Sequence, residues 1–211
     1  MTPVLEAVDH LIWVTPDLDT GIAALESRLG VRARPGGRHP GRGTHNALFG
    51  LGAGVYLEIL APDPTQPAPG RPRWLGVDAV GAPRLSSWAA KCTGVAGTVA
   101  AAARAGVRLG AAIAGGRLAP NGTRLDWTVS DPDVVTGDGI VPFLIDWGGT
   151  PHPSAGAPQG ARLLAFGARH PDAAAVRAQL RALGIDMDVQ IAAAPALVAT
   201  IACPRGRIEL R

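Results

Sequence analysis

The chain has 211 residues, of which 47% are hydrophobic and 18% are charged, with a formal net charge of +3. This composition is typical of globular proteins, and no apolar run approaches the roughly 18 residues that a membrane-spanning helix needs. The N-terminus lacks the basic and apolar segments of a secretory signal, so we expect a cytoplasmic protein that does not associate with membranes.

Basic residues are scattered rather than clustered. Lys91 is the only lysine, and the arginines occur singly, without a basic stripe interleaved with aromatic residues. Nucleic-acid binding needs such an electrostatic footprint, so we expect no nucleic-acid partner.

The first 62 residues predict one structural unit. Residues 5–14 are apolar and β-branched, as in a strand, and Thr15 and Pro16 begin a helix that Gly30 ends. Two short strands at 31–33 and 44–51 and an apolar strand at 55–60 complete the order βαβββ.

The same order returns twice, at 82–148 and, in a shorter form, at 160–211. Segments rich in Pro and Gly, at 61–73 and 148–160, separate the three units. A βαβββ unit forms a curved open sheet with its helix outside, and two paired units leave a concave interior suited to a ligand. We expect one compact body of three modules, in which the first pairs with either the second or the third.

Each unit carries one acidic residue in its closing strand: Glu58, Asp146 and Glu209. An unpaired carboxylate in an apolar strand costs several kcal/mol, so each needs a cation, an arginine or a proton. An ion pair with an arginine is the simpler interpretation for Glu209, which lies between Arg207 and Arg211.

His10 is the best partner for Glu58. The strand period of two places His10 on one face with Ile12 and Val14, and Glu58 on one face with Tyr56 and Leu60. An imidazole and a carboxylate on neighbouring strands can occupy two positions around a divalent ion. The alternative is an ordinary core histidine.

The other histidines are weaker candidates. His45 begins the strand before that of Glu58. It is a candidate for a further metal ligand or a general base, and the alternative is a hydrogen-bonding group at the end of a strand. Each of His39, His152 and His170 precedes a proline, which favours extended loop positions, and we expect these three at the surface.

Several residues are candidates for contact with a small-molecule ligand. Trp88, Trp127 and Trp147 can form apolar walls of the cleft, although core packing is expected for at least one of them. Arg117 is a candidate anchor for a substrate carboxylate, or else a solvated side chain.

Several segments resemble known families. Asp9-His10-Leu11, followed by the helix and then Tyr56-Leu57-Glu58, resembles the first module of the vicinal oxygen chelate superfamily. GRHPGRGTHN (37–46) and PFLIDW (142–147) are similar to the glyoxalase-like domain family. The resemblance covers residues 5–150. It implies an α+β fold of repeated βαβββ modules, with mixed curved sheets and helices outside.

The resemblance also implies a site and a chemistry. His10, Glu58 and either Asp146 or Glu209 would hold a divalent ion such as Zn, Ni, Mn, Fe or Mg. The ion would act as a Lewis acid in a lyase, isomerase or dioxygenase-like reaction on a small oxygenated substrate, and Glu58 or His45 would move the proton. Ser86 and Ala165 stand where the later units would need a second histidine.

That missing ligand favours an alternative function, a metal-free protein that binds and sequesters a small molecule.

If two units form the cleft, one of the three is left over. This unit either covers a sheet edge or pairs across a homodimer.

Overall fold

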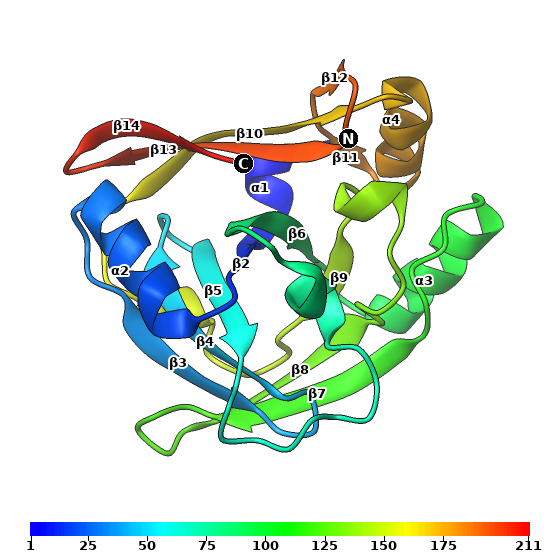
Figure 1. Cartoon of the computed structure of the whole chain (residues 1–211). Coiled ribbons are helices and arrows are strands. Elements are labelled where there is room, and N and C mark those ends of the chain that lie inside the picture. Colours follow the sequence, from blue (N-terminus) through cyan, green and yellow to red (C-terminus); the bar gives the residue numbers. More distant parts are fainter.

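The computed structural model describes residues 1–211. Fourteen strands form an eight-stranded sheet, a four-stranded sheet and a two-stranded pair, with four α-helices and three 3₁₀ helices (Figure 1). The expected α+β class with mixed curved sheets is confirmed. None of the helices is both long and apolar enough to span a membrane.

The large sheet combines the first two predicted units, in the order β3-β4-β5-β2-β6-β9-β8-β7. Central strands β2 and β6 run antiparallel and join the two halves, so the first unit pairs with the second. The first half comprises β2 (Val8–Val14), α2 (Leu18–Leu29), β3 (Arg34–His39), β4 (Thr44–Gly50) and β5 (Tyr56–Pro62). The second comprises η1 (Trp74–Ala79), β6 (Arg84–Lys91), α3 (Val95–Arg104), β7 (Ala112–Leu118), β8 (Arg124–Ser130), η2 (Gly137–Gly139) and β9 (Phe143–Asp146).

The large sheet curves until its two edge strands, β3 and β7, almost meet. A Cβ at Gly37 of β3 would lie only 2.8 Å from the carbonyl oxygen of Leu118 in β7. Gly37 also has a φ of 140°, which favours glycine. A residue without a side chain therefore lets the edges approach, and the sheet nearly closes around its concave face.

Several element boundaries differ from the sequence prediction. The strand expected at 31–33 forms later in the chain, as β3 at Arg34–His39. Residues Val4–Ala7 form the short helix α1 rather than the start of a strand, and β7 begins at Ala112 rather than at 107. Asp17 caps α2 instead of Thr15, because its carboxylate accepts the backbone N–H of Thr20 at 2.8 Å. The helix ends as predicted at Gly30, whose φ of 70° is left-handed.

The third unit lies across the outer face of the large sheet, drawn in yellow to red in Figure 1. After η3 (Pro153–Gly156) it comprises β10 (Arg162–His170), α4 (Ala173–Ala182), β11 (Ile185–Asp186), β12 (Val189–Ile191), β13 (Ala196–Cys203) and β14 (Gly206–Leu210). Its sheet has the order β12-β10-β13-β14, and β11 pairs with the N-terminal β1 (Thr2–Pro3).

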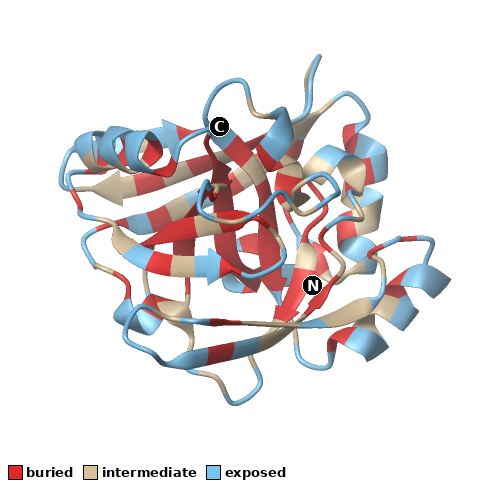
Figure 2. Cartoon of the chain, turned by 60° about the horizontal axis from the view of Figure 1, so that its bottom comes forward, coloured by how far each residue is buried: buried red, intermediate tan, exposed pale blue.

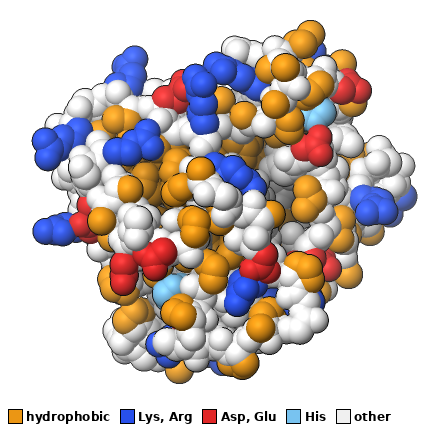
Figure 3. Space-filling model, in the orientation of Figure 1, with side chains coloured by type: hydrophobic (Ala, Val, Ile, Leu, Met, Phe, Trp, Pro, Cys, Tyr) orange, Lys and Arg blue, Asp and Glu red, His pale blue; other side chains and the backbone are white.

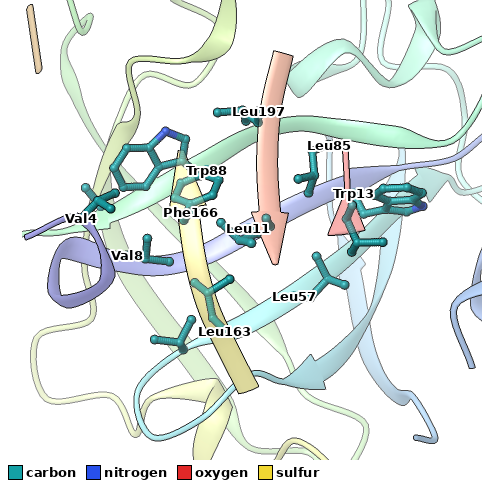
Figure 4. Packing of buried hydrophobic residues seen from close by; sticks show 14 of the residues in the cluster. Val4, Val8, Leu11, Trp13, Leu57, Leu85, Trp88, Leu163, Phe166 and Leu197 are labelled. Atoms are coloured by element: carbon teal, nitrogen blue, oxygen red, sulfur yellow. The ribbon is translucent and has the colours of Figure 1, made fainter. Parts of the chain in front are cut away.

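The main hydrophobic core fills the space between the two sheets. Leu11 and Trp88 of the large sheet pack with Leu163, Phe166 and Leu197 of the third unit (Figure 4). The rings of Trp88 and Phe166 meet edge to face, with centroids 5.2 Å apart. Figure 2 shows buried residues concentrated on the strands, while the helices expose one side.

Strand β2 is buried along its whole length. Leu11 and Trp13 face the main core, whereas Ile12 and Val14 face the concave side, where they pack with Leu60. This alternation also turns His10 toward the concave side.

Candidate functional site

The concave face of the large sheet encloses a cavity of about 430 Å³, which we call the inner cavity. Its wall combines aromatic and aliphatic side chains with a few polar ones, as in sites that bind small molecules. Both halves of the sheet contribute to its wall. The lining residues are His10, His39, Asn46, Tyr56, Glu58, Trp74, Leu75, Arg117, Trp127, Val129, Phe143, Ile145 and Trp147.

A hydrogen bond between neighbouring residues orients His10. The register of β2 against β6 shifts between Val8 and His10, as at a bulge, and Asp9 Oδ1 lies 2.7 Å from His10 Nδ1. Burial alone would raise the pKa of Asp9, but hydrogen bonds from His10 and His152 and their charges lower it well below its usual range. Because an ionised carboxylate only accepts, the neutral imidazole of His10 has its proton on Nδ1 and its lone pair on Nε2.

The free nitrogen of His10 faces Glu58. His10 Nε2 lies 3.6 Å from Glu58 Oε2, and the His10 ring stacks on Tyr56 with centroids 4.6 Å apart. Asn46 donates its amide N–H to Glu58 Oε1 at 2.5 Å. Asp9, His10 and Glu58 thus form a buried line of ionisable groups at one wall of the inner cavity.

His39 approaches Glu58 from the other side, with Nε2 3.8 Å from Oε1. Its Nδ1 lies 3.0 Å from the Thr44 hydroxyl. Burial lowers the pKa of His39 to about 4, although the negative charge of Glu58 opposes this shift, so His39 is neutral at neutral pH. The expectation that His39 lies at the surface is therefore wrong, because the end of β3 turns this side chain into the cavity.

His152 was also expected at the surface, and it too is a partner of the site. Its Nδ1 accepts the backbone N–H of Ser154, so Nε2 carries the proton and donates to Asp9 Oδ2 at 3.1 Å. Trp147 Nε1 donates to the same oxygen at 3.1 Å. The third of these histidines, His170, lies away from the inner cavity and pairs with Asp138 at 2.8 Å.

Arg117 is buried, with 5% of its surface exposed, yet it forms no ion pair. Its guanidinium donates only to the carbonyl oxygen of Gly36, across the gap between β7 and β3. Burial lowers the pKa of Arg117, and the negative charge of Glu58 opposes that shift. An arginine remains protonated even so. Its positive charge therefore stands at the cavity wall without a direct ion pair, although Glu58 lies near enough to favour it.

The three candidate tryptophans have different environments. Trp127 and Trp147 line the inner cavity, with ring centroids 5.5 Å apart. Trp88 does not, because it points from β6 into the main core and donates its Nε1–H to the Ile140 carbonyl at 2.7 Å. Its predicted contact with substrate is corrected to core packing.

Two predicted ligands lie outside the inner cavity. Phe143 and Ile145 of β9 face the cavity, so Asp146, one residue further, faces away. Its carboxylate accepts the backbone N–H groups of Gly94 and Gly148, which lower its pKa. Glu209 belongs to the third unit, where it pairs with Arg211.

His45 also points away from the cavity. Strand β4 turns Asn46 inward, and the alternation of side chains therefore turns His45 to the outer face. Of these two residues, the structure places Asn46 and not His45 at the cavity wall.

The donor set does not fit the divalent ion that the resemblance implies. His10 and Glu58 are available, but Ala89 pairs with His10 in the sheet, and the second half turns no acidic residue into the cavity. Even with His39, no group of three or more His, Cys, Asp or Glu side chains is arranged to hold a metal ion. A divalent ion would therefore lack a complete set of protein ligands here.

Sequence reasoning missed five residues of the site: Asp9, His39, Asn46, Tyr56 and His152. Two of them carried a usable signal. Tyr56 shares the strand parity of Glu58, and Asn46 follows His45 in a motif already singled out. The approach of His152 to Asp9 joins residues 143 positions apart, and no local pattern predicts it.

Comparisons with known proteins agree with this fold. The family model described as the glyoxalase-like domain matches residues 8–187. No curated protein matches. A solved structure of a hypothetical protein from Staphylococcus aureus has a TM-score of 0.69 at 12% identity, covering 90% of this chain and 87% of that one.

Methylmalonyl-CoA epimerases also match. The Mycobacterium tuberculosis enzyme has a TM-score of 0.45 at 16% identity, covering 74% of this chain and 95% of its own. A Streptomyces coelicolor variant in complex with 2-nitronate-propionyl-CoA has a TM-score of 0.47 at 19% identity, covering 71% of this chain and 99% of its own.

Proposed function

This chain belongs to the glyoxalase-like domain family, and from this premise we propose that it is an isomerase- or lyase-type enzyme. It acts on a small oxygenated substrate in the inner cavity, where His10 and Glu58 move the proton. The observation that carries the proposal is the buried line of Asp9, His10 and Glu58.

In this proposal each member of the line has a role. Asp9 fixes the tautomer of His10, so that the Nε2 lone pair faces the cavity. Glu58 is held by the Asn46 amide at 2.5 Å and opposes Nε2 at 3.6 Å. An acid–base pair held in position against a bound substrate typically contributes about 10²–10⁴-fold to the rate.

The proposed step is proton transfer next to a carbonyl group. The C–H bond breaks, the proton goes to Glu58 or His10 Nε2, and the electron pair of that bond moves toward the carbonyl oxygen. Return of the proton to a neighbouring atom completes an isomerisation, and departure of a leaving group instead completes an elimination.

The other residues of the cavity wall indicate which kind of substrate would bind. Trp127 and Trp147 offer flat apolar surfaces, and the unpaired Arg117 favours a negatively charged ligand. We therefore expect small carbonyl or hydroxy acids to bind before neutral molecules of the same size.

Solvent deuterium exchange tests this function without knowledge of the natural substrate. A panel of 2-oxo acids, 2-hydroxy acids and dicarbonyl compounds is incubated in D₂O, and NMR follows the loss of C–H signals. We expect exchange with at least one compound, and a rate at least about 100-fold lower for Glu58→Gln and His10→Ala. Glu209→Gln, the same change outside the cavity, is the matched control.

The metal-dependent form of the proposal is tested in the same assay. We expect the same rate after treatment with EDTA and after addition of Zn, Ni, Mn, Fe or Mg ions. A rate that rises at least about tenfold with one ion, and falls with EDTA, would instead support a metal enzyme.

A second candidate function is a metal-free binding protein. Ala89 and Ile145 favour it, because the second half of the sheet turns no acidic residue and no histidine into the cavity beside His10 and Glu58. Saturable binding of panel compounds without any exchange would establish this function and reject the enzyme.

A further inference from the structure

A second hollow adjoins the inner cavity. This outer pocket, of about 680 Å³, lies where the edge strands β3 and β7 meet the loop around η3. Arg117 lines both spaces. Arg34, Leu48, Asn121 and His152 also belong to the wall of the outer pocket.

The wall of the outer pocket is positively charged. Arg34 and Arg117 line it, and no Asp or Glu does. Arg34 donates to the carbonyl oxygen of Gly156 at 2.5 Å and Arg117 to that of Gly36, so both arginines hydrogen-bond backbone groups and neither forms an ion pair. The charge of Arg34 also contributes to the lowered pKa of Arg117, which means that the two guanidinium groups repel each other.

On the face drawn in Figure 3, Lys and Arg side chains are scattered, some beside an acidic side chain and others without one. In the outer pocket two arginines line one wall together, and no acidic side chain belongs to that wall. A guanidinium group has five N–H donors in a planar fork that matches a carboxylate or a phosphate. Most of these donors are unused at both arginines.

The outer pocket also adjoins the reacting groups. Leu48 of its wall is the β-sheet partner of Glu58. His152 of its wall donates to Asp9, which orients His10. A molecule bound by Arg117 therefore lies beside the proposed proton-transferring pair.

We propose that the outer pocket binds an anionic group of the substrate, a carboxylate or a phosphate, between Arg34 and Arg117. The substrate class is then an elongated anion, whose oxygenated end reacts in the inner cavity. This inference rests on the proposed function for the reacting end alone, since the anion site is independent of any chemistry at His10 and Glu58.

Titration of simple anions tests the site directly. Inorganic phosphate and succinate are titrated separately by isothermal calorimetry into the full chain, at constant ionic strength. We expect saturable binding of at least one anion, weakened at least about tenfold by Arg34→Gln and by Arg117→Gln, as the loss of a charge-assisted hydrogen bond implies. Arg207→Gln, an exposed arginine of the third unit, is the matched control and leaves the affinity unchanged.

The two anions distinguish the two chemical groups. Tighter binding of phosphate assigns a phosphate ester, tighter binding of succinate assigns a carboxylate, and equal binding supports an anion site without preference. If Arg117→Gln does not fold, Arg117→Lys keeps the charge without the planar fork, and we expect weakened binding.

Binding of neither anion, or equal affinity in all arginine variants, overturns the proposal. Failure of the proposed function is recognised separately. If phosphate or succinate still binds while no compound exchanges deuterium, the anion site is supported and the proposed enzymatic function is rejected. Glu58→Gln should leave anion binding intact or strengthen it, because it removes a nearby negative charge.

Discussion

Asp9 and His10 are consecutive in the chain, yet their side chains meet on the same side of β2, with Oδ1 and Nδ1 2.7 Å apart. Consecutive residues of a regular strand point to opposite faces. The shift in register between Val8 and His10 removes this restriction. A local irregularity of the backbone thus supplies the imidazole with a buried anionic partner.

Replacement of Asp9 by Asn should slow the proposed reaction while leaving the cavity intact. An amide no longer fixes the proton of His10 on Nδ1, because it can donate as well as accept. We expect the deuterium-exchange rate to fall about 100-fold. Asp146→Asn is the control, since Asp146 only caps backbone groups outside the cavity. An unchanged rate in Asp9→Asn would contradict the role of Asp9.

Neighbouring residues on β4 should behave differently when mutated. Asn46→Ala removes the hydrogen bond to Glu58, and we expect the exchange rate to fall at least about tenfold. His45→Ala changes the opposite face of the same strand, and we expect no change in rate. The test measures the deuterium-exchange rates of the two variants at one pH. Equal decreases in rate would show that Asn46 and His45 have been assigned to the wrong faces of β4.

Trp88 should contribute to stability rather than to ligand binding. Trp88→Phe leaves the buried Ile140 carbonyl without its donor and loses contacts with Phe166. We expect the free energy of unfolding in urea to fall by about 1–3 kcal/mol, with an unchanged exchange rate. A lower deuterium-exchange rate without a decrease in the free energy of unfolding would instead indicate that Trp88 contacts the substrate.

Asp63 should make the protein sensitive to acid. Burial raises the pKa of this carboxyl, but hydrogen bonds from Thr65 and Gln66 outweigh burial and lower the pKa to about 2. Since the pKa is lower in the folded state, the carboxylate stabilises the fold above its unfolded pKa of about 4, and this contribution disappears as the pH falls to about 2.

The test compares the wild-type protein with Asp63→Asn. We expect the variant to be less stable by about 2 kcal/mol at pH 6, with a smaller difference at pH 2.5. Thermal unfolding across this pH range measures it, and Asp186→Asn, at an exposed aspartate, is the control. A difference that does not change with pH would disprove the assignment to Asp63.

Strand alternation predicted part of the site correctly. His10 shares a face with Ile12 and Val14, and Glu58 shares one with Tyr56 and Leu60, as the period of two requires. Asp146 was proposed from its place in the repeated unit and the family resemblance, and His45 from its place at the start of a strand, so neither prediction assigned a strand face. A shift of one residue along a strand reverses the face of a side chain. Register depends on pairing with distant strands, which the sequence does not display.

The fold class and the repeated units were also predictable, since the helix-ending glycines and the apolar strands are local signals. The convergence of His39, His152 and Arg117 was not. Each comes from a loop or an edge strand, and long-range closure of the sheet brings them together. The separation between Arg117 and any carboxylate is likewise a property of the folded chain alone.

Strand β2 has no solvent-facing side, because the third unit packs against one face of it and the inner cavity occupies the other. Phe166 and Leu163 therefore support, through Leu11 and Trp88, the backbone that carries His10. Close-packed interiors transmit small displacements. A random screen for loss of function should consequently recover substitutions in β10 and β13, although neither strand contributes a side chain to the inner cavity or the outer pocket.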